Sequence, residues 1–209
     1  MQANPGILVD LRLSNRSMDL VEEGIDVAVR VAMSLDGPFV ARTLAVTRLA
    51  VWGAPAYFQK YGRPRRPEDL ASHRNLLFAE PRPRDEFVFE RGGRKTRVKL
   101  NAVMVSNSGE ALRLAAHAGV GLAIFPSFMA QADFDGGLVE PVLLDWSLPT
   151  LRVYAIYPHR RFLSPKVRLF VEALRAAYGD GSRDPWWPET TSTTRAARRT
   201  VSSPASPAR

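Results

Sequence analysis

The fold is decided by residues 19–30, which read Asp-Leu-Val-Glu-Glu-Gly-Ile-Asp-Val-Ala-Val-Arg. The first half of this stretch has the spacing of a short helix, because Met18 and Val21 lie three residues apart and Gly24 is placed to end it. We therefore expect a helix over Ser17–Glu23. The second half is nearly continuously apolar, which is typical of a strand buried on both faces, and it predicts a strand over Ile25–Val31.

Upstream of this stretch, apolar and polar side chains alternate. Apolar residues occupy every second position over Ile7–Leu13, and this period of two predicts another strand. A strand, a crossover helix and a second strand imply a parallel pair with a right-handed connection. The predicted fold class is therefore α/β.

The same signals predict further elements downstream. A hairpin is expected from Phe87–Glu90 to Arg97–Leu100 through Gly92-Gly93. Asn107 is followed by Glu110 three residues later, a capping-box arrangement, so Asn107 is expected to cap the helix that runs to His117. The remaining expected strands are Leu44–Trp52, Val103–Val105, Gly121–Phe125 and Leu151–Tyr157, and the remaining helices are Pro55–Tyr61, one turn at Pro67–Leu70, and the segment from Ser164 to its stop at Gly179.

Composition bounds the class of protein. The 209 residues include no cysteine, which excludes disulfides, zinc–thiolate sites and thiol catalysis, and suits a reducing cytoplasm. The first residues lack the cationic start and apolar run of a secretory signal, and no apolar run is long enough to span a membrane. Residues 181–209 offer little to bury apart from Trp186 and Trp187, so this tail is expected to be disordered.

The formal net charge of +8 does not by itself indicate a nucleic-acid-binding protein. Five arginines and three acids follow residue 179, which leaves +6 spread over the rest of the chain. Arginines scattered among acids are more typical of a solvated surface than of a track for phosphates.

Several short motifs follow one another along the chain, namely Asp19–Arg30, Ala54–Tyr57, Pro67–Leu70, Gly119–Pro126, and Tyr154–Pro158 followed by Leu163–Arg168. Taken in order, they closely resemble LysR-type transcriptional regulators. Each motif alone is weak, but together, at the family's spacing, they cover about residues 5–179 and are highly specific.

This resemblance implies a two-lobed fold like the type 2 periplasmic binding proteins, with a ligand cleft between the lobes. Lobe one is expected to comprise residues 1–47 and 155–180, and lobe two residues 48–154. The family's N-terminal winged helix-turn-helix does not appear in this sequence, nor do the first strand and helix of lobe one, so we expect an N-terminally truncated effector domain. The resemblance further implies a small-molecule effector, homo-oligomers in the cytoplasm, no membrane contact, and DNA binding only through the absent helix-turn-helix domain. The effector is expected to be acidic, because the free N–H groups at a helix start suit an anion.

Seven residues are candidates for binding the effector. The turn Asn107-Ser108 starts a helix, where free N–H groups favour an anion, although Asn107 serving only as a cap is an open alternative. Candidates at strand ends are Ser14 and Arg16, Arg30, and the pair Phe125 and Pro126, because α/β proteins bind ligands at the carboxyl edge of the sheet. Surface exposure for Arg16, a structural ion pair for Arg30 and core packing for Phe125 are the alternatives.

An enzyme is not expected. The sequence contains no nucleophile elbow, no zinc-protease motif and no phosphate-binding loop with lysine, and its three histidines have no ligand spacing, so neither a cofactor nor a metal is predicted. A stand-alone solute-binding protein of the same fold is the main alternative function, and the lack of a secretory signal argues against it. A nucleic-acid-binding protein would need a recognition helix or a stacking platform, and neither is recognised.

Overall fold

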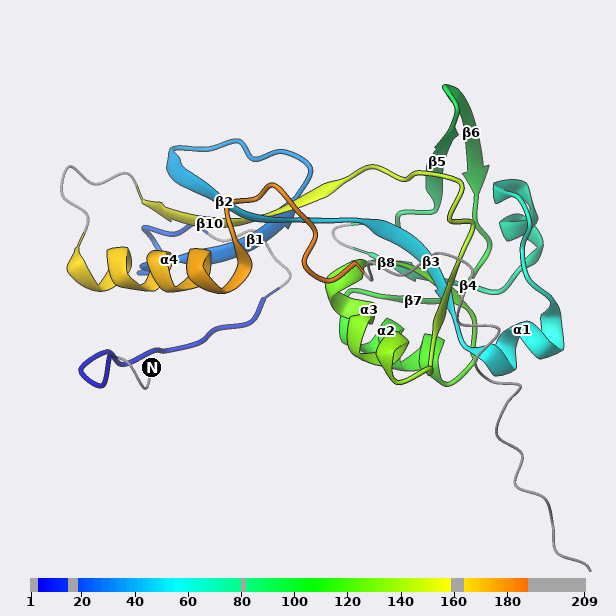
Figure 1. The fold of residues 1–209 in the computed structure, drawn as a ribbon, viewed down its shortest axis with the longest axis horizontal. Coiled ribbons are helices and arrows are strands. Elements are labelled where there is room, and N and C mark those ends of the chain that lie inside the picture. Colours follow the sequence, from blue (N-terminus) through cyan, green and yellow to red (C-terminus); the bar gives the residue numbers. More distant parts are fainter. Residues whose placement is uncertain (1–3, 15–18, 80–81, 159–163, 188–209) are drawn as a thin grey trace, which may run out of the picture.

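The computed structural model describes residues 4–14, 19–79, 82–158 and 164–187. Over these ranges the chain forms two main sheets that carry helices, one of three strands and one of five, and a separate two-stranded hairpin. Segments of the chain pass from one main sheet to the other (Figure 1). The α/β class is as expected from the sequence.

The first sheet has three strands in the order β1-β10-β2, all antiparallel. They are β1 (Ala28–Ala32), β2 (Phe39–Thr47) and β10 (Leu151–Pro158). The helix α4 (Pro165–Tyr178) packs against this sheet and begins as predicted, with the Ser164 hydroxyl accepting from the Val167 N–H. The core between this sheet and α4 contains the buried residues Leu44, Ala45, Val153, Ala155, Tyr157, Val167 and Val171.

The predicted parallel pair at the N-terminus is wrong. Residues 7–13 lie in no strand, and Leu8 and Leu13 are 93% and 88% exposed. β1 pairs instead with β10, a strand more than a hundred residues away, and the pair is antiparallel. Alternation over Ile7–Leu13 marks a segment that fits a pleated, half-buried surface, but it does not supply the neighbouring strand that such a segment needs.

The expected helix over Ser17–Glu23 is also not formed in the part that the structure describes. Residues 15–18 lie outside the described ranges, and residues 20–24 form turns rather than a helix. The Asp19 carboxylate accepts from the N–H groups of Val21 and Glu22 at 2.8 and 3.1 Å. These bonds lower the pKa of Asp19 and give the local backbone an alternative to helical bonding.

The second sheet has five strands in the order β7-β4-β8-β3-β9. β4 is parallel to both β7 and β8, whereas β3 is antiparallel to β8 and β9. The strands are β3 (Leu49–Gly53), β4 (Asn75–Phe78), β7 (Ala102–Ser106), β8 (Leu122–Pro126) and β9 (Glu140–Val142). The accompanying helices are α1 (Pro55–Tyr61), the 3-10 helix η1 (Pro67–Ser72), α2 (Gly109–His117) and α3 (Ser127–Asp135).

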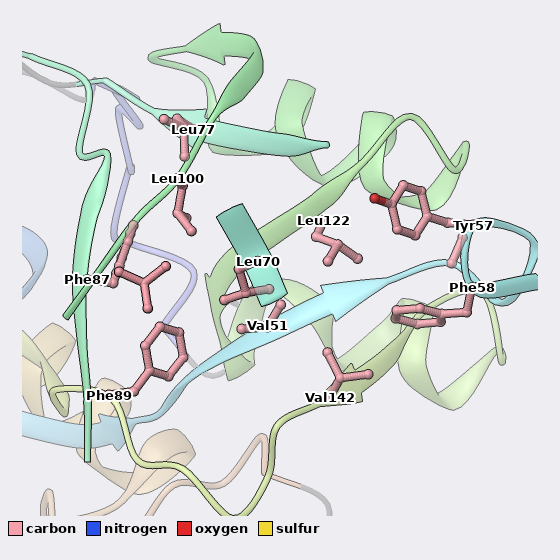
Figure 2. Close-up of a cluster of buried hydrophobic side chains, with 12 residues drawn as sticks. Val51, Tyr57, Phe58, Leu70, Leu77, Phe87, Phe89, Leu100, Leu122 and Val142 are labelled. Carbon is pink, nitrogen blue, oxygen red and sulfur yellow. The ribbon is translucent and has the colours of Figure 1, made fainter. Parts of the chain in front are cut away.

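The predicted hairpin is confirmed as β5 (Glu86–Arg91) and β6 (Arg94–Lys99), with Gly92 and Gly93 at positive φ in the turn. Its apolar face completes one of the two cores of the second sheet. Figure 2 shows Phe87 and Phe89 from the hairpin beside Leu70 of η1 and Val51 of β3. A second core joins β3, β4 and β8 to α2 and α3 and includes Trp52, Leu112 and Phe125.

The predicted strand Leu44–Trp52 is two strands in different sheets. β2 ends at Thr47, β3 begins at Leu49, and Arg48 lies between them at the crossing. The backbone of Arg48 leaves both ladders because its N–H donates to the Asp184 carboxylate and its carbonyl accepts from the Ser127 N–H, each at 2.8 Å. The run of strand-forming residues from Leu44 to Trp52 is unbroken, so the sequence gives no sign that the chain changes sheets at Arg48.

Gly121 provides a stability test of the packing beneath β8. A Cβ atom at this position would lie 2.6 Å from the carbonyl oxygen of Arg74, which is backbone and cannot swing away. We predict that Gly121→Ala lowers the free energy of unfolding by about 1–3 kcal/mol, the usual cost of overpacking, as measured by urea denaturation.

Gly6→Ala is the matched control, since a Cβ at Gly6 meets nothing within 4 Å. Its effect should stay within about 0.5 kcal/mol. Equal effects of the two substitutions would show that β8 does not approach Arg74 as described.

Candidate functional site

The carboxyl ends of the parallel strands gather several polar groups at one edge of the second sheet. β4, β7 and β8 run in the same direction and end at Phe78, Ser106 and Pro126. The start of β3 lies at the same edge, because Leu49 pairs with Pro126 in the antiparallel ladder. Ligands of α/β proteins bind at such an edge, and here the chain also crosses to the first sheet.

Ser108, rather than Asn107, caps α2. The Ser108 hydroxyl accepts from the Ala111 N–H at 3.2 Å, and the Ser108 N–H donates to the Ser106 hydroxyl at 3.0 Å. The predicted capping box is therefore wrong, because the Glu110 carboxylate is held by Arg113 one turn later. Asn107 is exposed and precedes the capping residue of α2.

Arg113 ties α2 to α3 beneath this edge. Its guanidinium donates to Glu110 on its own helix and to Asp133 on α3, the latter at 2.5 Å with the Asp133 side chain only 8% exposed. The hydrogen bonds to Glu110 and then to Asp133 raise the pKa of Arg113, and the bond from Arg113 lowers the pKa of Glu110. Gly109 lies against Met129, so the starts of the two helices lie close together.

A pair of buried hydroxyl groups lies where the two sheets meet. Thr47, the last residue of β2, and Ser127, the first of α3, are both 0% exposed, and their hydroxyl oxygens lie 2.8 Å apart. The Ser127 hydroxyl donates to the Asp184 carboxylate at 2.8–2.9 Å. Because a hydroxyl has one proton and a carboxylate only accepts, the Thr47 hydroxyl must donate to Ser127.

The same carboxylate receives two backbone bonds. The N–H of Arg48 donates to it at 2.8 Å, and the N–H of Trp186 donates at 3.1 Å. Asp184 is thus held by one hydroxyl and two amides, at the start of α3 where the helix dipole also favours negative charge. This arrangement of donors binds a carboxylate.

Residues 181–187 pack on the body of the protein, so the expectation of disorder is wrong for this part of the tail; residues 188–209 lie outside the described ranges. The carbonyl of Arg183 accepts from the Val46 N–H on β2 at 3.0 Å. Trp187 packs edge-on against Trp52 at 6.2 Å, and Trp186 lies 5.7 Å from Phe128. Two large aromatic rings bury enough apolar surface to order the short segment that carries them.

The structure brings some of the predicted site residues together and separates others. Asn107, Ser108 and Pro126 lie at the carboxyl edge of the second sheet. Phe125 is at the same edge, but its side chain is 4% exposed and packs in the core, which is the alternative that the sequence left open. Whether these residues bind a ligand stays a prediction.

The remaining predicted residues do not join them. Arg30 lies within β1, opposite Tyr154 of β10, and its side chain has partners. Ser14 is exposed in a segment that forms no strand, so the sheet edge that was meant to position it is not formed. Arg16 lies outside the described residues.

Sequence reasoning missed Thr47, Arg48, Ser127 and Asp184. Thr47 and Arg48 fell inside a predicted strand, and Ser127 follows Pro126 without being recognised as the start of a helix. A usable signal was present, because Pro126-Ser127 ends a buried strand and precedes an apolar helix, where a hydroxyl at the first turn is favoured. No local signal connects Asp184 to Arg48, which is 136 residues away.

The residues that the structure describes contain no cluster of three or more potential metal ligands and no helix long and apolar enough to cross a membrane. A cavity of about 650 Å³ lies beside α1 and the segment after β9, with Arg63, Arg65 and Trp146 in its lining. None of the predicted site residues contributes to it.

Comparisons with known proteins give a consistent answer. Residues 1–179 match the family described as the LysR substrate binding domain. The chain is 34% identical over 174 residues to an HTH-type transcriptional regulator of Xanthomonas campestris, covering 81% of the chain and 51% of that protein. It is 31% identical over 167 residues to an HTH-type transcriptional regulator of Haemophilus influenzae, covering 80% and 58%.

The chain thus spans about half the length of the curated relatives it matches, and these relatives are regulators rather than enzymes. Among solved structures, the regulatory domain of AphB in Vibrio vulnificus superposes with a TM-score of 0.69 at 25% identity. That match covers 85% of this chain and 87% of the solved one. The two-sheet architecture is therefore that of a regulatory domain.

Trp187 tests whether the tail segment is part of the folded body. Its ring packs against Trp52 and lies 5.3 Å beneath the Arg48 guanidinium. We predict that Trp187→Ala lowers the free energy of unfolding by about 1–3 kcal/mol in urea, less than the cost of removing a fully buried tryptophan.

Arg183→Ala is the control, because Arg183 contacts β2 through its backbone carbonyl, which alanine retains. Its effect should be within about 0.5 kcal/mol. If Trp187→Ala is equally silent, the segment is not docked in solution.

Proposed function

Because the chain belongs to the LysR substrate-binding domain family, we propose that it senses a small acidic molecule at the crossing between its two sheets. The supporting observation is the set of donors around the Asp184 carboxylate, namely the Ser127 hydroxyl and the Arg48 N–H. A free carboxylic acid presents the same two oxygens to the same donors.

The surroundings of these donors favour an anion over a cation or a neutral polar molecule. Backbone N–H groups can only donate, and the Thr47 hydroxyl is oriented so that Ser127 donates away from it. The start of α3 adds partial positive charge, and the Arg48 side chain is exposed beside the same position. Asn107 and Ser108 lie along the same edge and extend the set of polar groups toward α2.

The position of the donors explains how binding can alter the arrangement of the two sheets. Thr47 ends a strand of the first sheet, Ser127 follows a strand of the second, and Arg48 is the link between them. A ligand that bonds to these residues contacts both sheets at once. The ligand will favour the arrangement of the two sheets in which the donors lie close together. The size of this shift is set by the difference in the ligand's affinity for the two arrangements.

The biological output belongs to a longer protein in this proposal. The curated relatives are HTH-type regulators about twice as long as the matched segment, so we propose that DNA binding resides in a helix-turn-helix part outside these residues. The sensing domain then passes its change of arrangement to that part, which is allostery between two distinct sites. Assembly into homo-oligomers and location in the cytoplasm are parts of the same proposal, because the family resemblance implies both.

Acid binding can be tested with substitutions at the crossing. We predict that, within a panel of aromatic and aliphatic carboxylic acids, at least one binds the chain in calorimetry. Ser127→Ala should weaken its binding by about 1–3 kcal/mol, the range for a charge-assisted hydrogen bond. Asn107→Ala should weaken it in the same direction if the ligand reaches α2.

Ser147→Ala is the control, since that hydroxyl is exposed and donates only to the Glu90 carbonyl on the hairpin side. Its affinity for the acid should equal that of the unaltered chain. An affinity that Ser127→Ala leaves unchanged would place the binding site elsewhere.

DNA binding by the 209-residue chain is a separate test. Residues 1–179 match the sensing domain, so we predict only weak, sequence-independent binding to duplex DNA, driven by counterion release and lost by roughly 0.2 M salt. A footprint on a defined operator that persists at that salt concentration would contradict the proposal that DNA binding resides outside these residues.

A further inference from the structure

We infer that residues 184–187, Asp-Pro-Trp-Trp, act as a tethered competitor for the carboxylate site at the crossing, and that the free ligand is an acid carried on an aromatic ring. This inference rests on the proposed function, because it identifies what occupies that same site when no effector is bound.

The acidic half of the segment occupies the donors fully. The Asp184 carboxylate accepts from the Ser127 hydroxyl, the Arg48 N–H and the Trp186 N–H, all within 3.1 Å. The first two donors belong to the crossing, whereas the third belongs to the segment itself. A free acid would therefore find the two crossing donors already taken.

The aromatic half lies next to the acid. The bond from the Trp186 N–H closes a turn, and Trp187 then packs on Trp52 of β3 and under the Arg48 guanidinium. Trp186 lies on the other side, against Phe128 of α3 and Tyr178 of α4. Acid and indole are presented together, so the surface that receives them is complementary to a carboxylate with an aromatic ring a short linker away.

The tether makes this competition strong although the contacts are few. The segment is fixed just upstream, where Gly181 lies against Thr43 and the Arg183 carbonyl pairs with β2. A ligand joined by a short linker has an effective concentration on the order of millimolar. An acid in solution must overcome that concentration, so the segment raises the amount of effector that the domain needs.

Indole-3-acetate is a suitable probe, since it carries both a carboxylate and an indole. Calorimetry should give a dissociation constant at least tenfold lower for Asp184→Ala than for the unaltered chain, because the internal competitor has lost its carboxylate. Adding Ser127→Ala to Asp184→Ala should abolish the gain.

Asp180→Ala is the matched control, because Asp180 is an exposed acid four residues before Asp184, and its carboxylate accepts from Ser182 and not from the crossing. It should leave the affinity unchanged. A dissociation constant for Asp184→Ala within twofold of the unaltered chain would overturn the inference while leaving the proposed function intact. No binding of any acid by any variant would instead contradict the proposed function itself.

Proteolysis of the unaltered chain gives a second readout that does not depend on the variant folding well. Trypsin cleaves after Arg183, whose carbonyl is bonded to β2 while the segment is docked. Saturating indole-3-acetate should accelerate this cut severalfold and leave the cut after Arg91, the last residue of β5, unchanged. If bound probe leaves the Arg183 cut unchanged or slows it, the segment is not displaced and the inference fails.

Discussion

The arrangement of the molecule depends on how the backbone of one residue is satisfied as the chain leaves the first sheet for the second. Arg48 belongs to neither ladder, so its N–H and carbonyl need partners outside the strands. Its carbonyl is bonded by the first residue of α3 and its N–H by the carboxylate of Asp184. These two bonds fix α3, and with it the carboxyl edge of the second sheet, against the crossing.

The neighbouring elements follow from that anchor. α3 is joined to α2 by Arg113 and the buried Asp133, so the position of α3 determines where the start of α2 lies. The turn at Ser106–Ser108 is thereby held near the crossing although it comes from a strand that does not touch it. The anion site that we propose therefore uses contacts that also hold the two sheets together.

Features that depend on local sequence were predictable. The hairpin needs only its two glycines and the flanking alternation, and α4 needs only Ser164, Pro165 and its apolar face. Features that depend on distant partners were not. Alternation over Ile7–Leu13 carried no information about a neighbouring strand, and β1 found its partner in β10. The hydroxyl pair at the crossing was not predictable for the same reason, since Thr47 and Ser127 meet across 80 residues.

We propose that an acid binds at the crossing rather than at any other surface. The most direct test is the change in the amide NMR signals during titration with indole-3-acetate. We expect the amides of Arg48 and Ser127 to shift most, because the Arg48 N–H donates to the carboxylate position and Ser127 lies beside it. Shifts concentrated around Arg63 and Trp146, at the cavity beside α1, with the Arg48 amide unmoved, would contradict it.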